Sequence, residues 1–228
     1  MKALLGTLLL ISSNLSLGSG YQSLTIHELK TKITTIAEDN MERLDNLREV
    51  RQQLAPLVKQ LARKADLTVA ERIEGKIGSW QQLWTDDPDD TRSNNFFSRV
   101  DRSRTFQVVD EDGFFYNVSE LNTALNFKLT AFLRGEYVKQ DQGIGIKFTK
   151  LDIKLAGTKD ITATTYRLER GEEKFFTATR FSKYPQGPVG ARGYIDTVYV
   201  DDELRVDYGY NNADNELDLF ILRRVEAL

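Results

Sequence analysis

From residue 78 to the C-terminus, apolar and polar residues alternate in short segments, and no helix is expected between these segments. Alternation at every second position is typical of strands that bury one face. The clearest segment runs from Leu125 to Leu133. Further strands are expected at 79–85, 105–109, 114–118, 144–148, 151–155, 161–168, 174–181, 197–200, 203–208 and 216–225. Together these segments predict an antiparallel sandwich or barrel, and a small barrel can enclose one small apolar ligand.

Two local signals refine this prediction. The segment Asp110-Glu111-Asp112-Gly113 separates two alternating runs and indicates a hairpin. The apolar register of Ile144, Ile146 and Phe148 moves by one position at Leu151. This shift predicts a bend or a β-bulge near Thr149 and Lys150.

Residues 25–77 show a helical pattern instead. Thr25-Ile26-His27-Glu28 and Thr68-Val69-Ala70-Glu71 both fit a capping box, which marks a helix start. Between them, apolar residues recur at three- and four-residue steps from Ile26 to Leu61 and form one stripe. Pro56 lacks an N–H and is expected to break this helix or to start a second one near that position. The stripe would pack against the rest of the chain or a partner helix, and self-association of two copies is the alternative.

The first 20 residues resemble a targeting segment. Lys2 is followed by an apolar run, Ala3 to Ile11, and by small polar residues up to Gly20. This is the layout of a weak secretory signal, and an apolar N-terminus on a cytosolic protein is the alternative. No segment is long and apolar enough to cross a bilayer as a helix, so we expect a soluble or peripheral protein.

Composition excludes several classes of function. The 228 residues contain no cysteine and one histidine, and the net charge is −3. Thiol catalysis, cysteine-ligated metals and iron–sulfur clusters are therefore excluded, and no basic field for nucleic acid is present. The acidic loop at 86–90 lacks the ligand spacing of an EF-hand and is expected to be solvated. Asp196 and Asp201 could act together in acid–base chemistry, but no nucleophile or metal cluster accompanies them, so we expect no enzyme and no cofactor.

Two motifs carry a resemblance to a known family. Gly78-Ser79-Trp80-Gln81-Gln82-Leu83-Trp84-Thr85-Asp86 resembles the segment that opens the core of the plastid lipid-associated protein (PAP)/fibrillin family. A second segment resembles that family's C-terminal signature: Tyr194-Ile195-Asp196-Thr197-Val198-Tyr199-Val200-Asp201-Asp202-Glu203-Leu204-Arg205-Val206. Gly209 occupies the position of the glycine in that signature. Tyr208 departs from the arginine of that signature, and the hairpin at 211–215 is longer.

The resemblance implies a mainly β (α+β) fold, namely a lipocalin-like antiparallel β-barrel preceded by a helical segment. The chain would divide into a targeting segment (1–20), N-terminal helices (25–77) and the barrel domain (78–228). Members bind or organise lipophilic molecules (carotenoids, prenylquinones or fatty acids) at plastoglobules and thylakoid membranes. We therefore expect a peripheral protein of the thylakoid membrane, or one exported to the periplasm or the thylakoid lumen.

The strand pattern and the family resemblance together suggest candidate residues. Trp80 is expected to plug one end of the barrel, with Arg205 stacked on it and Arg223 as the alternative. Gly78, Trp80, Asp196, Arg205 and Gly209 form the structural signature, and the cavity candidates are Leu125, Phe127, Leu129, Leu133, Tyr137 and Tyr199. The alternative function is a solid barrel without a cavity, which serves as a protein–protein interaction module and forms homo-oligomers through its helices.

Overall fold

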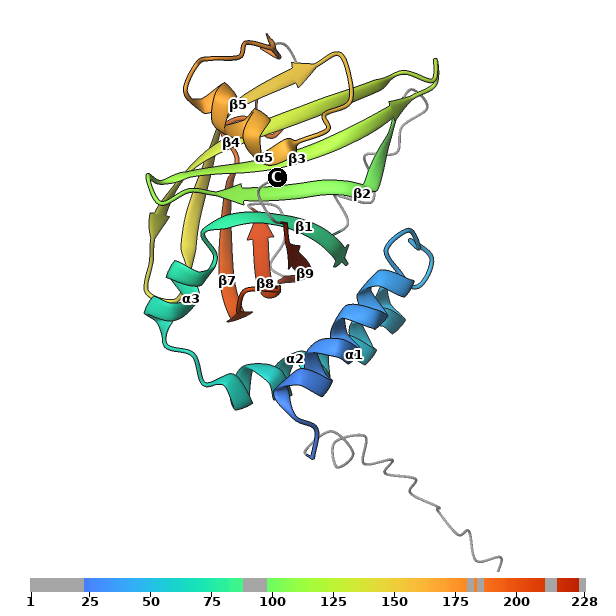
Figure 1. The fold of residues 1–228 in the computed structure, drawn as a ribbon, viewed down its shortest axis with the longest axis vertical. Coiled ribbons are helices and arrows are strands. Elements are labelled where there is room, and N and C mark those ends of the chain that lie inside the picture. The colour runs from blue at the N-terminus through green and yellow to red at the C-terminus, as the bar shows by residue number, and fades with distance from the viewer. Residues whose placement is uncertain (1–22, 88–97, 180–182, 184–186, 212–216, 226–228) are drawn as a thin grey trace, which may run out of the picture.

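The computed structural model describes residues 23–87, 98–179, 183, 187–211 and 217–225. Three helices precede the strands: α1 (Ile26–Asp39), α2 (Leu47–Ala65) and α3 (Val69–Gly75). The strands and one further helix follow in the order β1 (Gly78–Thr85), β2 (Ser98–Val109), β3 (Phe114–Thr123), β4 (Lys128–Lys139), β5 (Ile144–Lys154), α5 (Ile161–Glu169), β6 (Phe176–Thr177), β7 (Arg192–Val200), β8 (Leu204–Asn211) and β9 (Asp218–Arg224). Figure 1 shows the strands curling around one another above the α1–α2 hairpin.

Eight of these strands close into an antiparallel barrel. The sheet runs β4-β3-β2-β1-β9-β8-β7-β5, and the additional pairing of β4 with β5 closes it. The short strand β6 extends β5 outside this ring. The prediction of a mainly β barrel behind an N-terminal helical segment is therefore confirmed.

The barrel has a closed end and an open end. At the closed end, α3 leads into Gly78, and β9 finishes at Arg224 close to the β7–β8 turn. The turns β2–β3 and β4–β5 also lie at this end, because both follow strands that run toward it. The opposite, open end carries the β3–β4 turn, the end of β5 and the start of β9.

The predicted strand at 161–168 is wrong, because these residues form helix α5. Three threonines favoured the strand interpretation. However, the buried residues Ile161, Thr164, Thr165 and Leu168 follow helical spacing, and the Asp160 side chain accepts a hydrogen bond from the Ala163 N–H at 2.8 Å. The buried face of α5 packs on the outer side of β2, β3 and β4. Of the predicted strand at 174–181, only Phe176–Thr177 is a strand among the described residues.

The two capping boxes are confirmed, but the expected break at Pro56 is wrong. Thr25 and Thr68 each accept from the N–H three residues on, and the glutamates reach back. The chain breaks instead between Asn40 and Asn46, whereas Pro56 lies inside α2. Leu54 and Leu57 on either side of it are buried, and this packing outweighs the lost backbone hydrogen bond.

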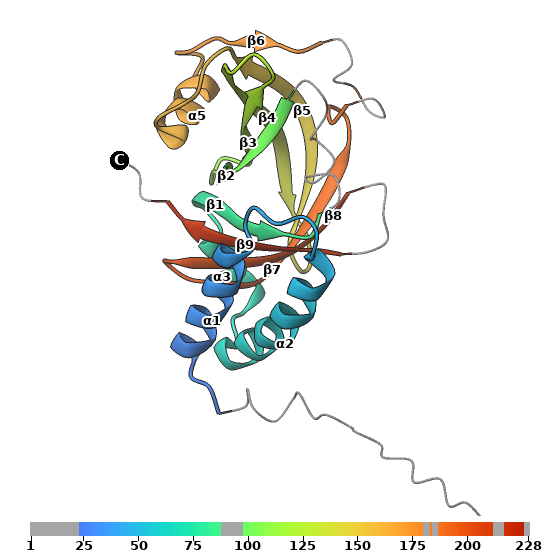
Figure 2. The same ribbon diagram turned by 90° about the vertical axis from the view of Figure 1, so that its right-hand side faces the viewer.

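The apolar stripe of the helices is buried within the chain. Leu29, Ile33, Leu54 and Leu61 lie at 0% exposure against residues of β1, β8 and β9 such as Trp84, Val206 and Ile221. Figure 2 shows α1 and α2 lying along the outer side of these strands. The stripe therefore has a partner in the same chain, and self-association through the helices stays a prediction.

The β2–β3 hairpin and the bulge at Thr149 are as predicted, whereas the start of β4 is not. The β2–β3 hairpin forms across the predicted turn, and the register of β4 against β5 shifts where Thr149 lies unpaired, as the pattern predicted. The predicted strand 125–133 begins only at Lys128. Leu125 and Phe127 instead lie in the turn after β3, where Asn126 adopts a φ of 59°.

Because the helices share their apolar face with the barrel, Leu54→Ala is expected to destabilise the whole fold. Removing a fully buried leucine side chain costs about 2–5 kcal/mol. The matched change Leu44→Ala, at a residue 37% exposed, is expected to stay within about 0.5 kcal/mol. Urea unfolding followed by tryptophan fluorescence and far-UV circular dichroism measures both. If only the helical signal changed in Leu54→Ala, the helices would be a separate unit.

Candidate functional site

The strand register decides which side chains point into the barrel. Residues that lie directly opposite each other in an antiparallel pair share one face. Trp80 lies opposite Gln107, Gln107 opposite Asn117, and Asn117 opposite Leu133. This row crosses β1, β2, β3 and β4 on the inner face.

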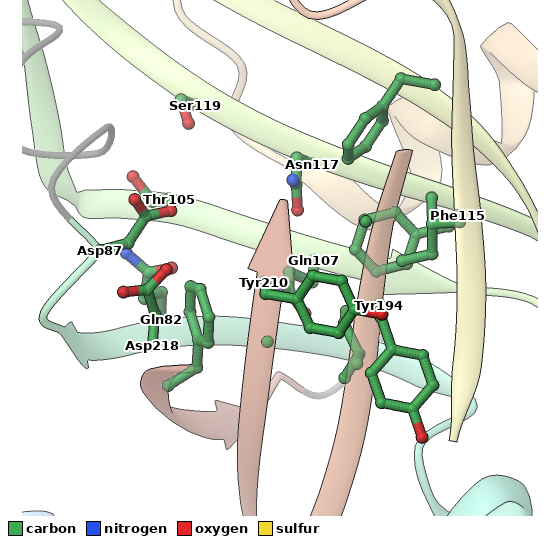
Figure 3. A pocket seen from close by; sticks show the side chains of 16 residues that line it. Gln82, Asp87, Thr105, Gln107, Phe115, Asn117, Ser119, Tyr194, Tyr210 and Asp218 are labelled. Carbon is green, nitrogen blue, oxygen red and sulfur yellow. The ribbon is translucent and has the colours of Figure 1, made fainter. Parts of the chain in front are cut away.

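A cavity of about 180 Å³ lies inside the barrel. Figure 3 shows its lining side chains on opposite sides of the space. One wall is polar and includes Gln82, Thr105, Gln107, Asn117 and Ser119. The other wall is apolar and includes Phe115, Ile146, Phe148, Ile195 and Phe220. Toward the open end the lining continues to Asp87 and Asp218, so the cavity offers a ligand both ring contacts and hydrogen bonds.

Trp80 fills the closed end below this cavity. It is fully buried, and its indole N–H donates to the Lys76 carbonyl at 2.8 Å. The Arg205 guanidinium lies 5.1 Å from the ring centroid, as the sequence motif suggested. A second guanidinium, that of Arg224, lies closer, at 4.2 Å. Cations over an indole face are attracted by its quadrupole.

The sequence pattern suggested Arg223 as the alternative to Arg205, but the second guanidinium over Trp80 belongs to Arg224. Arg223 points to the outer side of the barrel, where it bonds Glu38 and Gln81. Arg224 donates to the carbonyls of Gly75 and Ile77 and thereby ties the end of β9 to the entry of β1. The alternation along β9 could have identified Arg224, because Arg224 lies directly opposite Trp80 and shares its inner face, whereas Arg223 does not.

A buried ion pair supports the plug. Arg205 Nε lies 2.9 Å from Asp207 Oδ2, and both side chains are 1% exposed. Asp207 also accepts from the Thr197 hydroxyl at 2.6 Å. Arg205 donates to Gln107 Oε1 and to the Lys76 carbonyl. The charge of Arg205 is therefore neutralised beneath the cavity and not presented to it.

The bond to Arg205 fixes the orientation of the Gln107 amide. A guanidinium only donates, so the acceptor Oε1 must face Arg205. The amide Nε2 then faces away from Arg205. Since Gln107 lines the cavity, it supplies an oriented N–H donor on the polar wall.

Lys76 is a buried lysine beside this pair. It is 1% exposed, and among the described residues its Nζ has no hydrogen-bond partner. Burial lowers the pKa of the Lys76 ammonium to about 8, although the nearby Asp207 raises it in part. Keeping this charge inside the fold costs free energy.

Two signature glycines allow close approach of the backbone. Gly78 has a φ of 126°, and a Cβ there would lie 2.6 Å from an Arg224 nitrogen. A Cβ on Gly209 would lie 3.0 Å from the Phe220 ring. Glycine at these positions lets Arg224 and Phe220 approach the barrel wall.

The six cavity candidates from the sequence do not line the cavity. Leu125 and Phe127 lie in the β3–β4 turn and are exposed. Leu129 and Leu133 are on the inner face and only partly buried; Leu133 lies opposite the lining residue Asn117, but neither leucine lines the cavity. The Tyr137 hydroxyl donates to the Asp110 carbonyl at 2.6 Å. The Tyr199 hydroxyl donates to Asp201 beneath the helices.

Asp196 and Asp201 do not form a catalytic pair. Asp196 pairs with Arg72 at 3.1 Å, and Asp201 accepts from Lys30 and Tyr199. Burial raises the pKa of Asp196, and Arg72 partly offsets this rise. Among the described residues, no group of three or more His, Asp or Glu side chains could hold a metal ion. Most of the acidic loop, residues 88–90, lies outside the described ranges.

The polar wall was not predicted, although a signal for it exists. Gln82, Gln107 and Asn117 lie in the middle of predicted strands, where amide side chains are uncommon. Combined with the hairpin register, they would have marked a polar strip on the same face as Trp80. The targeting segment 1–20 lies outside the described residues.

Comparison with known proteins gives one match. The model of the PAP_fibrillin family matches residues 27–222, so the chain belongs to the PAP/fibrillin family. This family is generally structural and lipid-associated, and it is plastid-associated. No curated protein and no solved structure matches the chain. In the described part of the chain, no helix has the length and apolar character that a membrane span requires.

Gly78→Ala is expected to destabilise the barrel more than Gly171→Ala. Both glycines have a positive φ: 73° at Gly171, near the left-handed helical region, where a Cβ costs about 1–2 kcal/mol, and 126° at Gly78, farther from any region that residues with a Cβ populate. Only at Gly78 does the new Cβ also clash, with Arg224, whereas nothing lies within 4 Å at Gly171. Thermal unfolding of both variants measures the difference. Equal losses would show that Arg224 moves aside without cost.

Lys76→Met is expected to raise the free energy of unfolding at pH 7 by about 3 kcal/mol. The pKa of Lys76 is about 8 in the fold against an ordinary value of 10.5. The unfolded chain therefore holds this proton more tightly, and the stability of the natural protein rises with pH above about 8. The advantage of the variant should shrink accordingly between pH 8 and pH 9.5. Urea unfolding at several pH values tests this, and a pH-independent advantage would contradict it.

Proposed function

We propose that the barrel binds a lipophilic molecule without chemical turnover and that the cavity holds its polar end. The observation that carries the proposal is the cavity inside the barrel, which is lined by amide and hydroxyl side chains and by apolar side chains that include three phenylalanine rings. Such a lining fits an amphipathic ligand, because apolar contacts supply affinity and a few polar groups set orientation. Membership of a lipid-associated family supports the same conclusion.

The size of the cavity limits what it encloses. Pockets for a whole drug-sized ligand measure about 300–1,000 Å³, whereas a cavity of about 150 Å³ accommodates a benzene ring. The cavity of about 180 Å³ therefore suits one ring or head group. A long tail would continue toward the open end along an apolar inner wall, which we define as Leu121, Leu129, Leu133, Leu151 and Ile153.

The electrostatics of the lining favour a neutral head group. The described lining includes no Lys, Arg or His, and it includes Asp87 and Asp218. Gln107 supplies an N–H donor, which a ligand carbonyl can accept. Of the ligand classes expected from the sequence, a prenylquinone or an oxygenated carotenoid ring suits this lining better than the carboxylate of a fatty acid.

Location is part of the proposal. Peripheral association with a photosynthetic or other membrane would give the barrel access to such ligands. The plastid association of the family and the absence of a spanning helix among the described residues support this placement.

Ligand uptake by the purified protein tests the proposal. The probes are a decyl-substituted dimethylbenzoquinone, a decyl-substituted dimethylbenzene of the same shape without carbonyl oxygens, and decanoate. Native mass spectrometry and calorimetric titration measure their binding. We expect the quinone to bind at least about tenfold more tightly than the other two. Failure of all three to bind would show a filled barrel and refute the proposal.

Gln107→Glu separates the polar wall from general apolar binding. The variant keeps an oxygen toward Arg205 but replaces the N–H donor by an acceptor, so the preference for the quinone should disappear. Gln81→Glu is the matched control, because Gln81 lies on the outer face and bonds Ser103 and Arg223. An unchanged preference in Gln107→Glu would show that another group recognises the carbonyl oxygen.

A further inference from the structure

Four large apolar side chains are exposed together at the open end of the barrel. Leu125 is 81% exposed, Phe127 48%, Leu155 76% and Phe176 66%. We call these four residues the apolar rim. Isolated exposed apolar residues are common, but a group of them marks an interaction surface.

The rim comes from three segments that lie side by side. Leu125 and Phe127 occupy the β3–β4 turn, and Leu155 follows the end of β5. Phe176 lies in β6, directly opposite Ile153 of β5. Figure 2 shows β6 and the neighbouring strand ends at the top of the molecule, far from α1 and α2.

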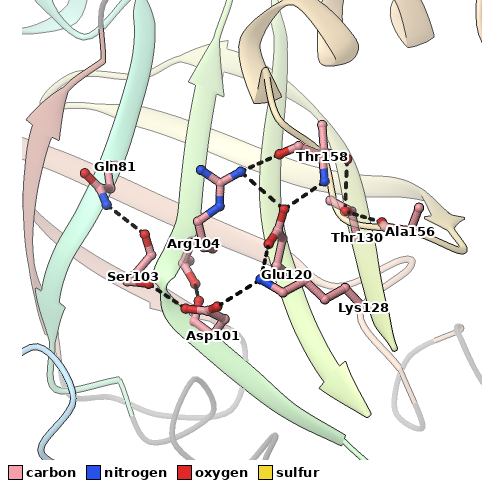
Figure 4. A network of polar contacts seen from close by, with 10 residues as sticks. Gln81, Asp101, Ser103, Arg104, Glu120, Lys128, Thr130, Ala156 and Thr158 are labelled. Carbon is pink, nitrogen blue, oxygen red and sulfur yellow. Dashed lines mark hydrogen bonds and ion pairs between the residues drawn. The ribbon is translucent and has the colours of Figure 1, made fainter. Parts of the chain in front are cut away.

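A polar network holds the segment of Leu155 in place. Figure 4 shows Glu120 of β3 at its centre. Glu120 accepts from the Thr158 N–H at 2.8 Å, and the Thr158 hydroxyl donates to Thr130. Thr130 in turn donates to the Ala156 carbonyl at 2.8 Å. The backbone next to Leu155 is therefore held by hydrogen bonds, although the Leu155 side chain is exposed.

Lysines flank the rim: the segments 123–128, 153–159 and 174–178 contain Lys128, Lys154, Lys159 and Lys174. Lys128 pairs with Asp101 and Glu120, and Asp152, Asp160 and Glu173 border these segments in the sequence. Apolar tips flanked by lysines fit the surface of a membrane that carries anionic lipids, because the tips enter the interface while the lysines meet the head groups.

The rim also continues into the barrel. Phe176 and Ile153 share the inner face with Ala131, and the apolar inner wall runs from there toward the cavity. A lipophilic molecule that left a bilayer at the rim would meet apolar side chains along this path.

We infer that the apolar rim docks the open end of the barrel on the surface of an anionic lipid bilayer. This inference rests on the proposed function for its purpose, but vesicle binding and ligand uptake are measured separately. In the docked orientation the open end of the barrel faces the lipid, and α1 and α2 face water.

Vesicle flotation with the full-length protein tests the inference. The vesicles are phosphatidylcholine alone or phosphatidylcholine with about 30% phosphatidylglycerol, at low and high salt. We expect binding to the anionic vesicles that weakens with salt. The variant Leu125→Ser/Phe127→Ser/Leu155→Ser/Phe176→Ser should bind at least about tenfold more weakly. The control Val138→Ser changes a residue 64% exposed outside the rim and should bind normally.

Tryptophan scanning gives the orientation. Phe127→Trp should be quenched by brominated acyl chains, whereas Val138→Trp should not. Absence of vesicle binding by the natural protein, or normal binding by the four-site variant, would overturn the inference. Loss of self-association instead of vesicle binding, measured by analytical ultracentrifugation, would show that the rim contacts a second copy and would also overturn it.

Ligand uptake separates this inference from the proposed function. The four-site rim variant should take up the quinone from solution as the natural protein does. Gln107→Glu should bind vesicles normally. If neither protein takes up a ligand but vesicle binding depends on the rim, the docking surface stands and the container function fails.

Discussion

The buried pair of Arg205 and Asp207 constrains the rest of the barrel. Removing two charges from water is costly, and the cost is recovered only when every partner is in place. Those partners come from different elements: Gln107 from β2, Thr197 from β7 and the Lys76 carbonyl from the end of α3. A slip of one residue in any of these strands would turn its side chain to the other face. The pair therefore favours one register around the closed end, and Trp80 is held there between Arg205 and Arg224.

This register gives the barrel interior two kinds of wall. The row that starts at Trp80 continues through Gln107 and Asn117, so the polar groups gather on β1, β2 and β3. The apolar side chains come from β3, β5, β7 and β9. Outside, α1 and α2 cover one side and α5 covers another, and the four residues of the apolar rim are exposed at the open end. The inside and the outside of the molecule thus direct apolar contacts toward the same end.

Local chemistry made much of this fold predictable. Three kinds of feature depend only on neighbouring residues, and each prediction is confirmed: the capping boxes at Thr25 and Thr68, the β2–β3 hairpin and the bulge at Thr149. Helix α5 was missed because its threonines favour strands until a sheet face is available to bury them. The cavity residues were missed for a different reason. Whether a leucine near position 125 lies in a strand or a turn depends on where β3 and β4 pair, and that pairing is a property of the whole barrel.

The order of the elements along the chain differs from their order in space. The helices α1 and α2 come first, yet their apolar stripe packs on β8 and β9, and Glu38 pairs with Arg223 across 185 residues. Strands β1 and β9 also pair although they lie far apart along the chain. In a chain that is made from its N-terminus, the sheet face that covers the helical stripe is complete only when β8 and β9 have appeared. Such distant contacts slow folding, and part of the apolar face of the helices stays uncovered until the C-terminal strands have been made.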